Sequence, residues 1–230
     1  LEFRRVLFRS SAKTLEDLVG LFVMPGVASP IGMGVRPDAK NSSLNVLYAG
    51  QAQLGLPDRD YYLVDSPKNR EILTKYKAYL TFILGEAGFA DAAKSAEAVV
   101  QLETKMARAN WDRALGRNRD LTYNKMPIAD FLAFAPEVPL KAALEKQGLG
   151  KVTEIIVAQV PPTAEEIAAA KLTPDQAAKL SGGVPALAKL IASEPIASWQ
   201  AWLASRYITG KAAVLPKRID DAAFAFYGTT

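Results

Sequence analysis

The stretch QAQLGLPDRDYYLVDSP, Gln51–Pro67, sets an arginine between two aspartates, with an apolar turn before them and two tyrosines after them. Two neighbouring carboxylates can share a proton in acid–base catalysis, and an arginine can hold an anionic substrate. Alternatively, Pro57 sets a turn, Asp58 and Asp60 accept nearby hydrogen bonds, and the tyrosines pack in the core. We favour the second interpretation, in which Arg59 and the aspartates fix a turn and an ion pair between segments.

The sequence contains no histidine and no cysteine in its 230 residues. Histidine is the usual general base near neutral pH and the commonest zinc ligand, and cysteine supplies thiolate nucleophiles, disulfides and thiolate metal sites. Ser-His-Asp and Cys-His catalysis are therefore excluded within this chain. The sequence also lacks a DxDxDG loop, a phosphate-binding G-x-x-x-x-G-K-[ST] loop and a dinucleotide-binding glycine pattern. Its residues alone indicate no self-contained catalytic site.

The first ten residues, LEFRRVLFRS, carry three arginines but fail as a signal peptide. The chain begins with leucine, and neither an apolar stretch nor a small-residue cleavage site follows the arginines. We interpret residues 1–10 as a remnant of cloning or sequence assembly and exclude them from the fold. Without them the chain loses three positive charges and one negative, so the net charge falls from +4 to +2. So small an excess does not indicate a nucleic-acid partner.

The sequence after residue 10 is typical of a mainly α multi-helix fold with a small β-hairpin element. The runs IGMGV (31–35) and SLNVLYAG (43–50) flank a turn-rich segment and predict the two strands of the hairpin. VTEIIVAQV (152–160) is β-branched and apolar, which predicts one further strand. The longest nearly apolar run, residues 18–28, is interrupted by Pro25 and is too short for a bilayer, so we expect no membrane span.

Helices account for most of the rest. Ser66 followed by Pro67 predicts an N-cap and a first helical position, and an apolar stripe continues this helix to Gly85. A second amphipathic helix is predicted over residues 91–110. The last third is again helical and ends in KRIDDAAFAFYG, where we expect apolar side chains to be exposed.

The segment ETKMARANWDRALGRNRDLTYNKM, residues 103–126, interleaves arginines with acidic and aromatic residues. Arginines beside aromatic rings can bind the phosphates and bases of a nucleic acid. Because acidic residues alternate with the arginines, we expect mutual ion pairs instead and no nucleic-acid partner.

Four motifs follow one another along the chain: GLPDRDYYL after NVLYAGQ, then RNRDLTYNKM, IASWQAWLASRYI and AAFAFYGTT. In this order and spacing they resemble the neprilysin-like zinc metallopeptidases, which include the endothelin-converting enzymes and bacterial endopeptidases. The first resembles the family signature G-L-P-[DS]-R-D-Y-Y, and the second an R-x-R-D-x-x-Y-N-x-M turn. The resemblance gives structural roles to Gly55, Leu56, Pro57, Asp58, Arg59, Asp60, Tyr61, Tyr62, Arg119, Asp120, Tyr123, Asn124, Met126, Phe226, Tyr227 and Gly228.

The resemblance implies the N-terminal lobe of a two-lobed zinc metalloendopeptidase that hydrolyses peptides. In the family the zinc ligands, an H-E-x-x-H helix and a later glutamate, lie in the C-terminal half. None of them matches a position here, so we assign no catalytic, metal or substrate-binding residue and expect this chain to bind no zinc and to be inactive alone. Its implied partners are peptide substrates and the C-terminal catalytic lobe, and its implied location is the periplasm, the cell surface or the exterior.

By the same resemblance, residues 11–65 would pass between the lobes as an extended segment with short strands. Residues 66–230 would form an incomplete helical lobe that encloses the active-site cavity and restricts substrates to peptides. The alternative is a stand-alone, non-catalytic helical module that binds peptides. A reading frame that continues past Thr230 into H-E-x-x-H would distinguish the two.

Overall fold

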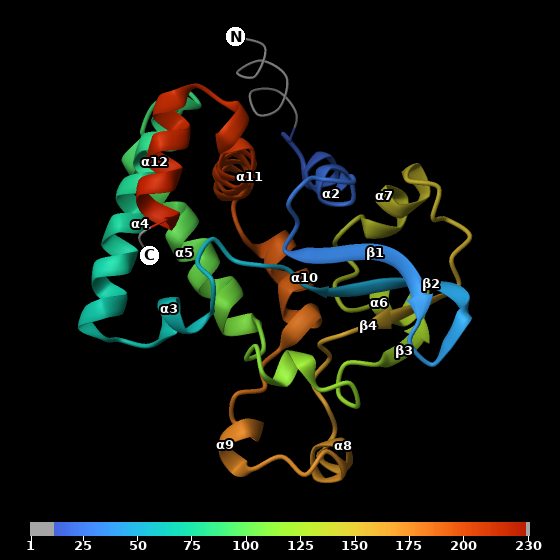
Figure 1. Ribbon diagram of the computed structural model, residues 1–230. Coiled ribbons are helices and arrows are strands. Elements are labelled where there is room, and N and C mark those ends of the chain that lie inside the picture. Colours follow the sequence, from blue (N-terminus) through green and yellow to red (C-terminus); the bar gives the residue numbers. More distant parts are fainter. Residues whose placement is uncertain (1–11, 229–230) are drawn as a thin grey trace.

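The computed structural model describes residues 12–228, which form helices packed around a small four-stranded sheet. Figure 1 shows the long helices α4, α5 and α12 on one side and the sheet with α6 and α7 on the other. The helices are α2 (Leu15–Phe22), α3 (Asp60–Leu63), α4 (Pro67–Glu86), α5 (Ala92–Ala109), α6 (Ile128–Leu132), α7 (Leu140–Lys146), α8 (Ala164–Ala169), α9 (Pro174–Ala177), α10 (Gly183–Ser193), α11 (Ile196–Lys211) and α12 (Lys217–Tyr227). The strands are β1 (Ile31–Asp38), β2 (Asn41–Gln51), β3 (Asn124–Pro127) and β4 (Glu154–Val157), and two short 3₁₀ turns are η1 (Leu115–Arg117) and η2 (Ala212–Val214).

The two long predicted helices are confirmed with their predicted starts. The Ser66 hydroxyl accepts a hydrogen bond from the Asn69 N–H at 3.1 Å, and Pro67 is the first residue of α4. The Asp91 carboxylate caps α5 in the same way. In α12 the Phe224 side chain is exposed, as expected for the last helix.

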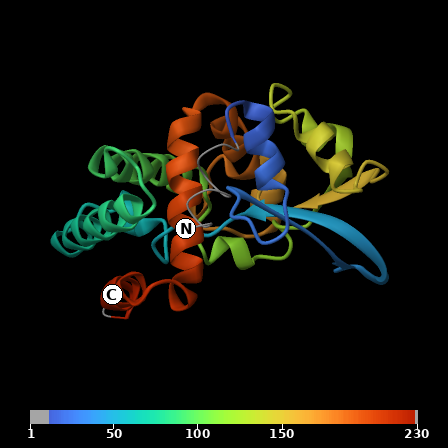
Figure 2. The same cartoon turned by 90° about the horizontal axis from the view of Figure 1, so that it is seen from above.

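The sheet has the strand order β1-β2-β4-β3. β1 and β2 form the predicted antiparallel hairpin, and Figure 2 shows it extending away from the long helices. β4, also predicted, pairs parallel with β2, and β3 pairs antiparallel with β4. Sequence patterns do not predict β3, because its four residues, NKMP, include no β-branched side chain and end in proline. Its pairing with β4 is what makes it a strand.

The sheet joins two parts of the chain that the sequence analysis separates. β2 belongs to residues 11–65 and β4 to residues 66–230, yet they are hydrogen-bonded neighbours. One hydrophobic cluster also includes residues from both parts. The division of the chain into an inter-lobe segment and a helical lobe therefore stays a prediction.

Helix α5 occupies the centre of the helical part and packs against α3, α4, α10 and α11. On α11, the buried rings of Trp199 and Trp202 meet the Phe22 ring of α2 at centroid distances of 5.3 and 6.3 Å. Helix α11 thus connects α2 to the central helix. Among residues 12–228, no helix is both long enough and apolar enough to cross a membrane.

Gly183 gives a test of how α10 is joined to the sheet. Its φ is 56°, and a Cβ added there would lie 2.3 Å from the carbonyl oxygen of Gln159, which already accepts the Val184 N–H at 2.8 Å. We expect Gly183→Ala to lower the free energy of unfolding in urea by about 2 kcal/mol or more. Gly20→Ala in α2 is the matched control, because an added Cβ meets nothing within 4 Å there. Equal stability of the two variants would contradict the expected strain.

Candidate functional site

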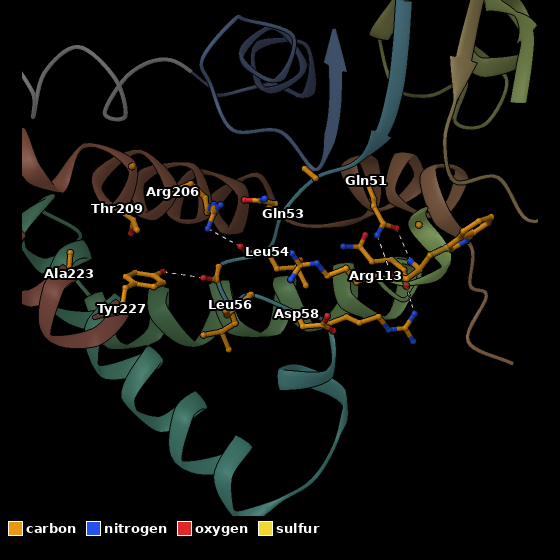
Figure 3. A pocket seen from close by; sticks show the side chains of 18 of the residues that line it. Gln51, Gln53, Leu54, Leu56, Asp58, Arg113, Arg206, Thr209, Ala223 and Tyr227 are labelled. Carbon is orange, nitrogen blue, oxygen red and sulfur yellow. Dashed lines mark hydrogen bonds between the residues drawn. The ribbon is translucent and has the colours of Figure 1, made fainter. Parts of the chain in front are cut away.

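A cleft of about 930 Å³ lies between the extended segment that follows β2, the loop after α5, and helices α11 and α12. Figure 3 shows the labelled side chains Gln51, Arg113, Arg206 and Tyr227 arranged along it. The charged residues in its lining are Asp58, Arg59, Arg113, Arg117, Arg206 and Asp220. A cleft of this size can take a small molecule or part of a peptide. It is therefore the candidate functional site.

Beneath the segment that lines the cleft lies Glu103 of α5, whose side chain has no exposed surface. Its Oε1 accepts hydrogen bonds from the Gly55 N–H and the Trp202 indole N–H, each at 2.9 Å. Its Oε2 accepts hydrogen bonds from the hydroxyls of Tyr62 and Tyr76 at 2.8 and 2.9 Å. These five residues, named here the Glu103 cluster, join α3, α4, α5, α11 and the segment after β2.

The segment after β2 is also held from its other side. Arg206 donates a hydrogen bond to the Leu54 carbonyl at 3.0 Å, and the Tyr227 hydroxyl donates to the Gly55 carbonyl at 3.2 Å. A Cβ added at Gly55 would lie 1.7 Å from the Tyr76 hydroxyl oxygen. Only glycine fits at this position without displacing the tyrosine.

The protonation states in the Glu103 cluster follow from burial. Burial raises the pKa of Glu103 above its ordinary value, and Arg206 and the hydrogen bonds from Tyr62, Tyr76 and Trp202 oppose that rise. Burial also raises the pKa of Tyr62 and of Tyr76 well above 10, so both hydroxyls keep their protons. Because four donors point at two oxygens, the arrangement suits an ionised carboxylate, and we assign that state to Glu103 near neutral pH.

Asp58, Arg59 and Asp60 take local roles beside the cleft. The Asp58 carboxylate accepts the Asp60 N–H at 3.1 Å. Arg59 donates to the carbonyl oxygens of Asn110 and Lys179, and its closest carboxylate is that of its neighbour Asp60, at 4.0 Å. The expected ion pair between segments is therefore wrong: Arg59 does link separate segments, but it does so through main-chain carbonyls, which offer acceptors at fixed positions.

The residues of the second motif join strands rather than face the cleft. The Tyr123 hydroxyl donates to the Asp38 carboxylate at 2.8 Å, which ties β3 to the end of β1. The Asn124 side-chain amide donates to the Leu121 and Val157 carbonyls at 3.0 and 2.9 Å. This part of the motif connects β3 to β1 and to β4.

The ion pairs expected within residues 103–126 are also wrong. Arg119 and Asp120 are exposed, and no arginine of this segment forms an ion pair with another of the described residues. Two of the acids have other partners: Glu103 is enclosed by its cluster, and Asp112 accepts the Ala114 N–H at 2.8 Å. Arg113 and Arg117 are left facing the cleft.

The remaining signature residues pack against the core or end an element. Phe226 stacks on the rings of Tyr76 and Tyr79, with both centroid distances at 5.5 Å. Tyr61 and Met126 are partly buried against the core, Leu56 is buried, Pro57 lines the cleft, and Gly228 follows α12.

Comparisons with known proteins identify the family. The family model described as "Peptidase family M13", for its N-terminal region, matches residues 4–230. The chain belongs to peptidase family M13. It is 34% identical to endothelin-converting enzyme 1 of Mus musculus over 107 residues, which cover 45% of this chain and 14% of that enzyme.

Solved structures of M13 peptidases share the fold. The Mycobacterium tuberculosis zinc metalloprotease Zmp1 in its open state superposes with a TM-score of 0.75 and 27% identity, covering 95% of this chain and 31% of Zmp1. PepO from a Lactobacillus, at 18% identity and a TM-score of 0.66, shows the same fold. The M13 chain described here thus spans less than a third of the length of these solved relatives.

Membership of this family implies zinc in full-length members. This chain contains no histidine or cysteine, and its residues 12–228 include no cluster of three or more carboxylates that could hold a metal ion. The residues present therefore do not fit a zinc site.

Sequence reasoning missed Glu103, Tyr76, Trp202 and Arg206. A signal for Glu103 was present, since it lies four residues after Val99 and three before Met106, on the buried stripe of an amphipathic helix. A carboxylate on such a stripe needs donors from other elements. Which residues supply them is decided by tertiary packing alone.

Gly55 tests the close approach at the cluster. We expect Gly55→Ala to lower the free energy of unfolding by about 3 kcal/mol, because the methyl group must displace the Tyr76 hydroxyl or lift the segment off Glu103. Urea unfolding measures the loss. Gly34→Ala in β1 is the matched control, because an added Cβ meets nothing within 4 Å there. The assignment fails if both variants unfold at the same urea concentration.

Glu103 tests the charge state of the cluster through pH. Its folded pKa is raised above the ordinary 4.5, so its contribution to stability is full below pH 4.5 and declines as pH rises through the folded pKa. Glu103→Gln has no such titration, so the stability of the native chain minus that of Glu103→Gln should decrease with rising pH. A difference that increases with pH would show the opposite shift. Glu103→Ala leaves four buried donors without an acceptor and should cost about 3–5 kcal/mol at acidic pH, and this cost should likewise decrease as pH rises.

Proposed function

We propose that this chain is the N-terminal part of a zinc-dependent metalloendopeptidase and supplies the lobe that restricts its substrates to peptides. The supporting observation is the family match over residues 4–230, together with a fold shared with Zmp1 over 95% of the chain. Peptide hydrolysis would then take place on zinc ligands that the rest of the protein provides.

In this proposal the cleft forms part of the wall of the active-site cavity. Its lining offers the guanidinium groups of Arg113 and Arg117 as donors to peptide carbonyls or carboxylates. It also includes Asn110, whose side-chain oxygen is buried and accepts no hydrogen bond from the described residues. The Glu103 cluster would keep this wall rigid.

The test uses the full-length protein, obtained by reading the gene past the codon for Thr230. We expect the frame to continue into H-E-x-x-H, and the zinc-loaded enzyme to cleave a short peptide but to spare the same peptide inserted in a loop of a folded carrier. Equal cleavage of both substrates would contradict size restriction. A full-length protein without zinc-dependent hydrolysis, or a stop after Thr230, would favour the stand-alone peptide-binding module.

A substitution at Arg59 distinguishes a structural role of this residue from a catalytic role in the full-length enzyme. Arg59→Glu replaces a donor to two carbonyl oxygens with an anion that they repel, so the melting temperature should fall by several degrees, about 1–3 kcal/mol of stability. Below the new melting temperature, kcat for a short peptide should stay within about twofold of the native value. A variant that keeps its melting temperature and loses peptide cleavage would give Arg59 a catalytic role instead.

A further inference from the structure

A second groove, of about 580 Å³, runs along β1. Its walls come from α2 with the turn that follows it, from β1 itself, and from α7. Figure 1 shows α2 and α7 on the same side of β1. The groove adjoins the cleft, because Ala52, Gln53 and Arg206 line both.

β1 is an edge strand, and the register shows which of its main-chain groups point outward. The Ala52 N–H donates to the Pro30 carbonyl, so these two residues face each other, and every second pair after them exchanges hydrogen bonds between β1 and β2. Independently, the Ala49 carbonyl accepts the Ala158 N–H, so Ala49 faces β4 and its partner Met33 faces away from β2. The N–H and C=O groups of Met33 and Val35 therefore point to the free edge.

These outward groups have no partner among residues 12–228, since β1 pairs only with β2. They lie two residues apart, at the spacing of about 7 Å at which an added strand forms hydrogen bonds. Between them, Gly34 leaves open space, because an added Cβ would meet nothing within 4 Å. Packing within the described chain does not explain a glycine inside this strand, and such glycines often mark the close approach of another backbone.

The groove beside this edge is mostly apolar. Its lining includes Phe22, Leu47, Leu144, Leu149 and Trp202. Strand addition in general draws affinity from main-chain hydrogen bonds and specificity from recesses that receive alternate side chains. The edge and the groove together supply both.

We propose that β1 binds an extended peptide by strand addition, with main-chain hydrogen bonds to Met33 and Val35 and an apolar peptide side chain in the groove. This site goes beyond the proposed function, because it lies on this chain and requires neither zinc nor catalysis. The bound peptide would lie beside the cleft, because Ala52 and Gln53 line both the groove and the cleft.

The ligand is a reversibly bound peptide rather than a permanent strand of the same protein or of a second copy. Beyond Val35, β1 carries features that stop a longer strand from pairing with this edge: Arg36, Pro37, and an irregular register between Pro37 and Asp38. A permanently covered edge needs no such protection. Val35, at the middle of the edge, is 57% exposed.

The test measures binding of a fluorescein-labelled, blocked peptide of alternating threonine and leucine to this chain by fluorescence anisotropy. Val35→Pro removes an outward N–H and leaves the hydrogen bonds to β2 in place, so Kd should rise at least about tenfold. Val35→Thr has nearly the same shape and keeps the N–H, so its Kd should stay within about twofold. The same peptide N-methylated at alternate residues should also lose binding.

Amide hydrogen exchange shows where the peptide binds and guards against a variant that fails to fold. In the native chain, exchange at Met33 and Val35 should slow when the peptide is added, and Met33→Pro provides a second variant at the same edge. The proposal is overturned if the peptide does not bind, or if both proline variants fold and bind it as tightly as the native chain. It is also overturned if Met33 and Val35 are already protected without peptide, in a dimer of this chain or in the monomeric full-length protein.

Discussion

The buried carboxylate of Glu103 is the constraint on which the helical part of this chain depends. A charge removed from water is tolerated only if donors replace its hydration, and here four of them do so from separate elements. Each donor fixes the distance of its own element from α5. The cluster therefore determines the geometry of packing, whereas the surrounding apolar contacts supply most of the free energy.

The cleft follows from the same constraint. The GLPDRDYY segment is hydrogen-bonded to Glu103 of α5 through the Gly55 N–H and the Tyr62 hydroxyl. On its other side, Arg206 and Tyr227 donate to the carbonyls of Leu54 and Gly55. Its main chain thereby becomes one wall of the cleft. Helix α11 serves both purposes, since Trp202 belongs to the cluster and Arg206, one turn later, lines the cleft. Substitutions in the core of this M13 chain should therefore also shift the residues that form the cleft wall.

The shared fold extends over more of the chain than the detected sequence similarity does. Similarity to endothelin-converting enzyme 1 of the mouse covers 45% of the chain, whereas the fold of Zmp1 covers 95% of it. A fold can persist where sequence similarity is no longer detected, because packing tolerates substitutions of similar shape and polarity. The GLPDRDYY segment is less free to vary, because a glycine, a tyrosine hydroxyl and an arginine must each reach a fixed atom.

The sequence by itself determined the helices α4 and α5, the β1–β2 hairpin and β4, because caps, prolines and apolar periodicity are local signals. It also excluded histidine- and cysteine-based chemistry, and its motifs identified the family. Only the tertiary structure decided that Glu103 meets donors from four other segments, that Arg59 binds carbonyls instead of carboxylates, and that NKMP becomes a strand beside β4. Each of these depends on residues far apart in the chain, and a local pattern carries no information about which distant group will be at hydrogen-bonding distance.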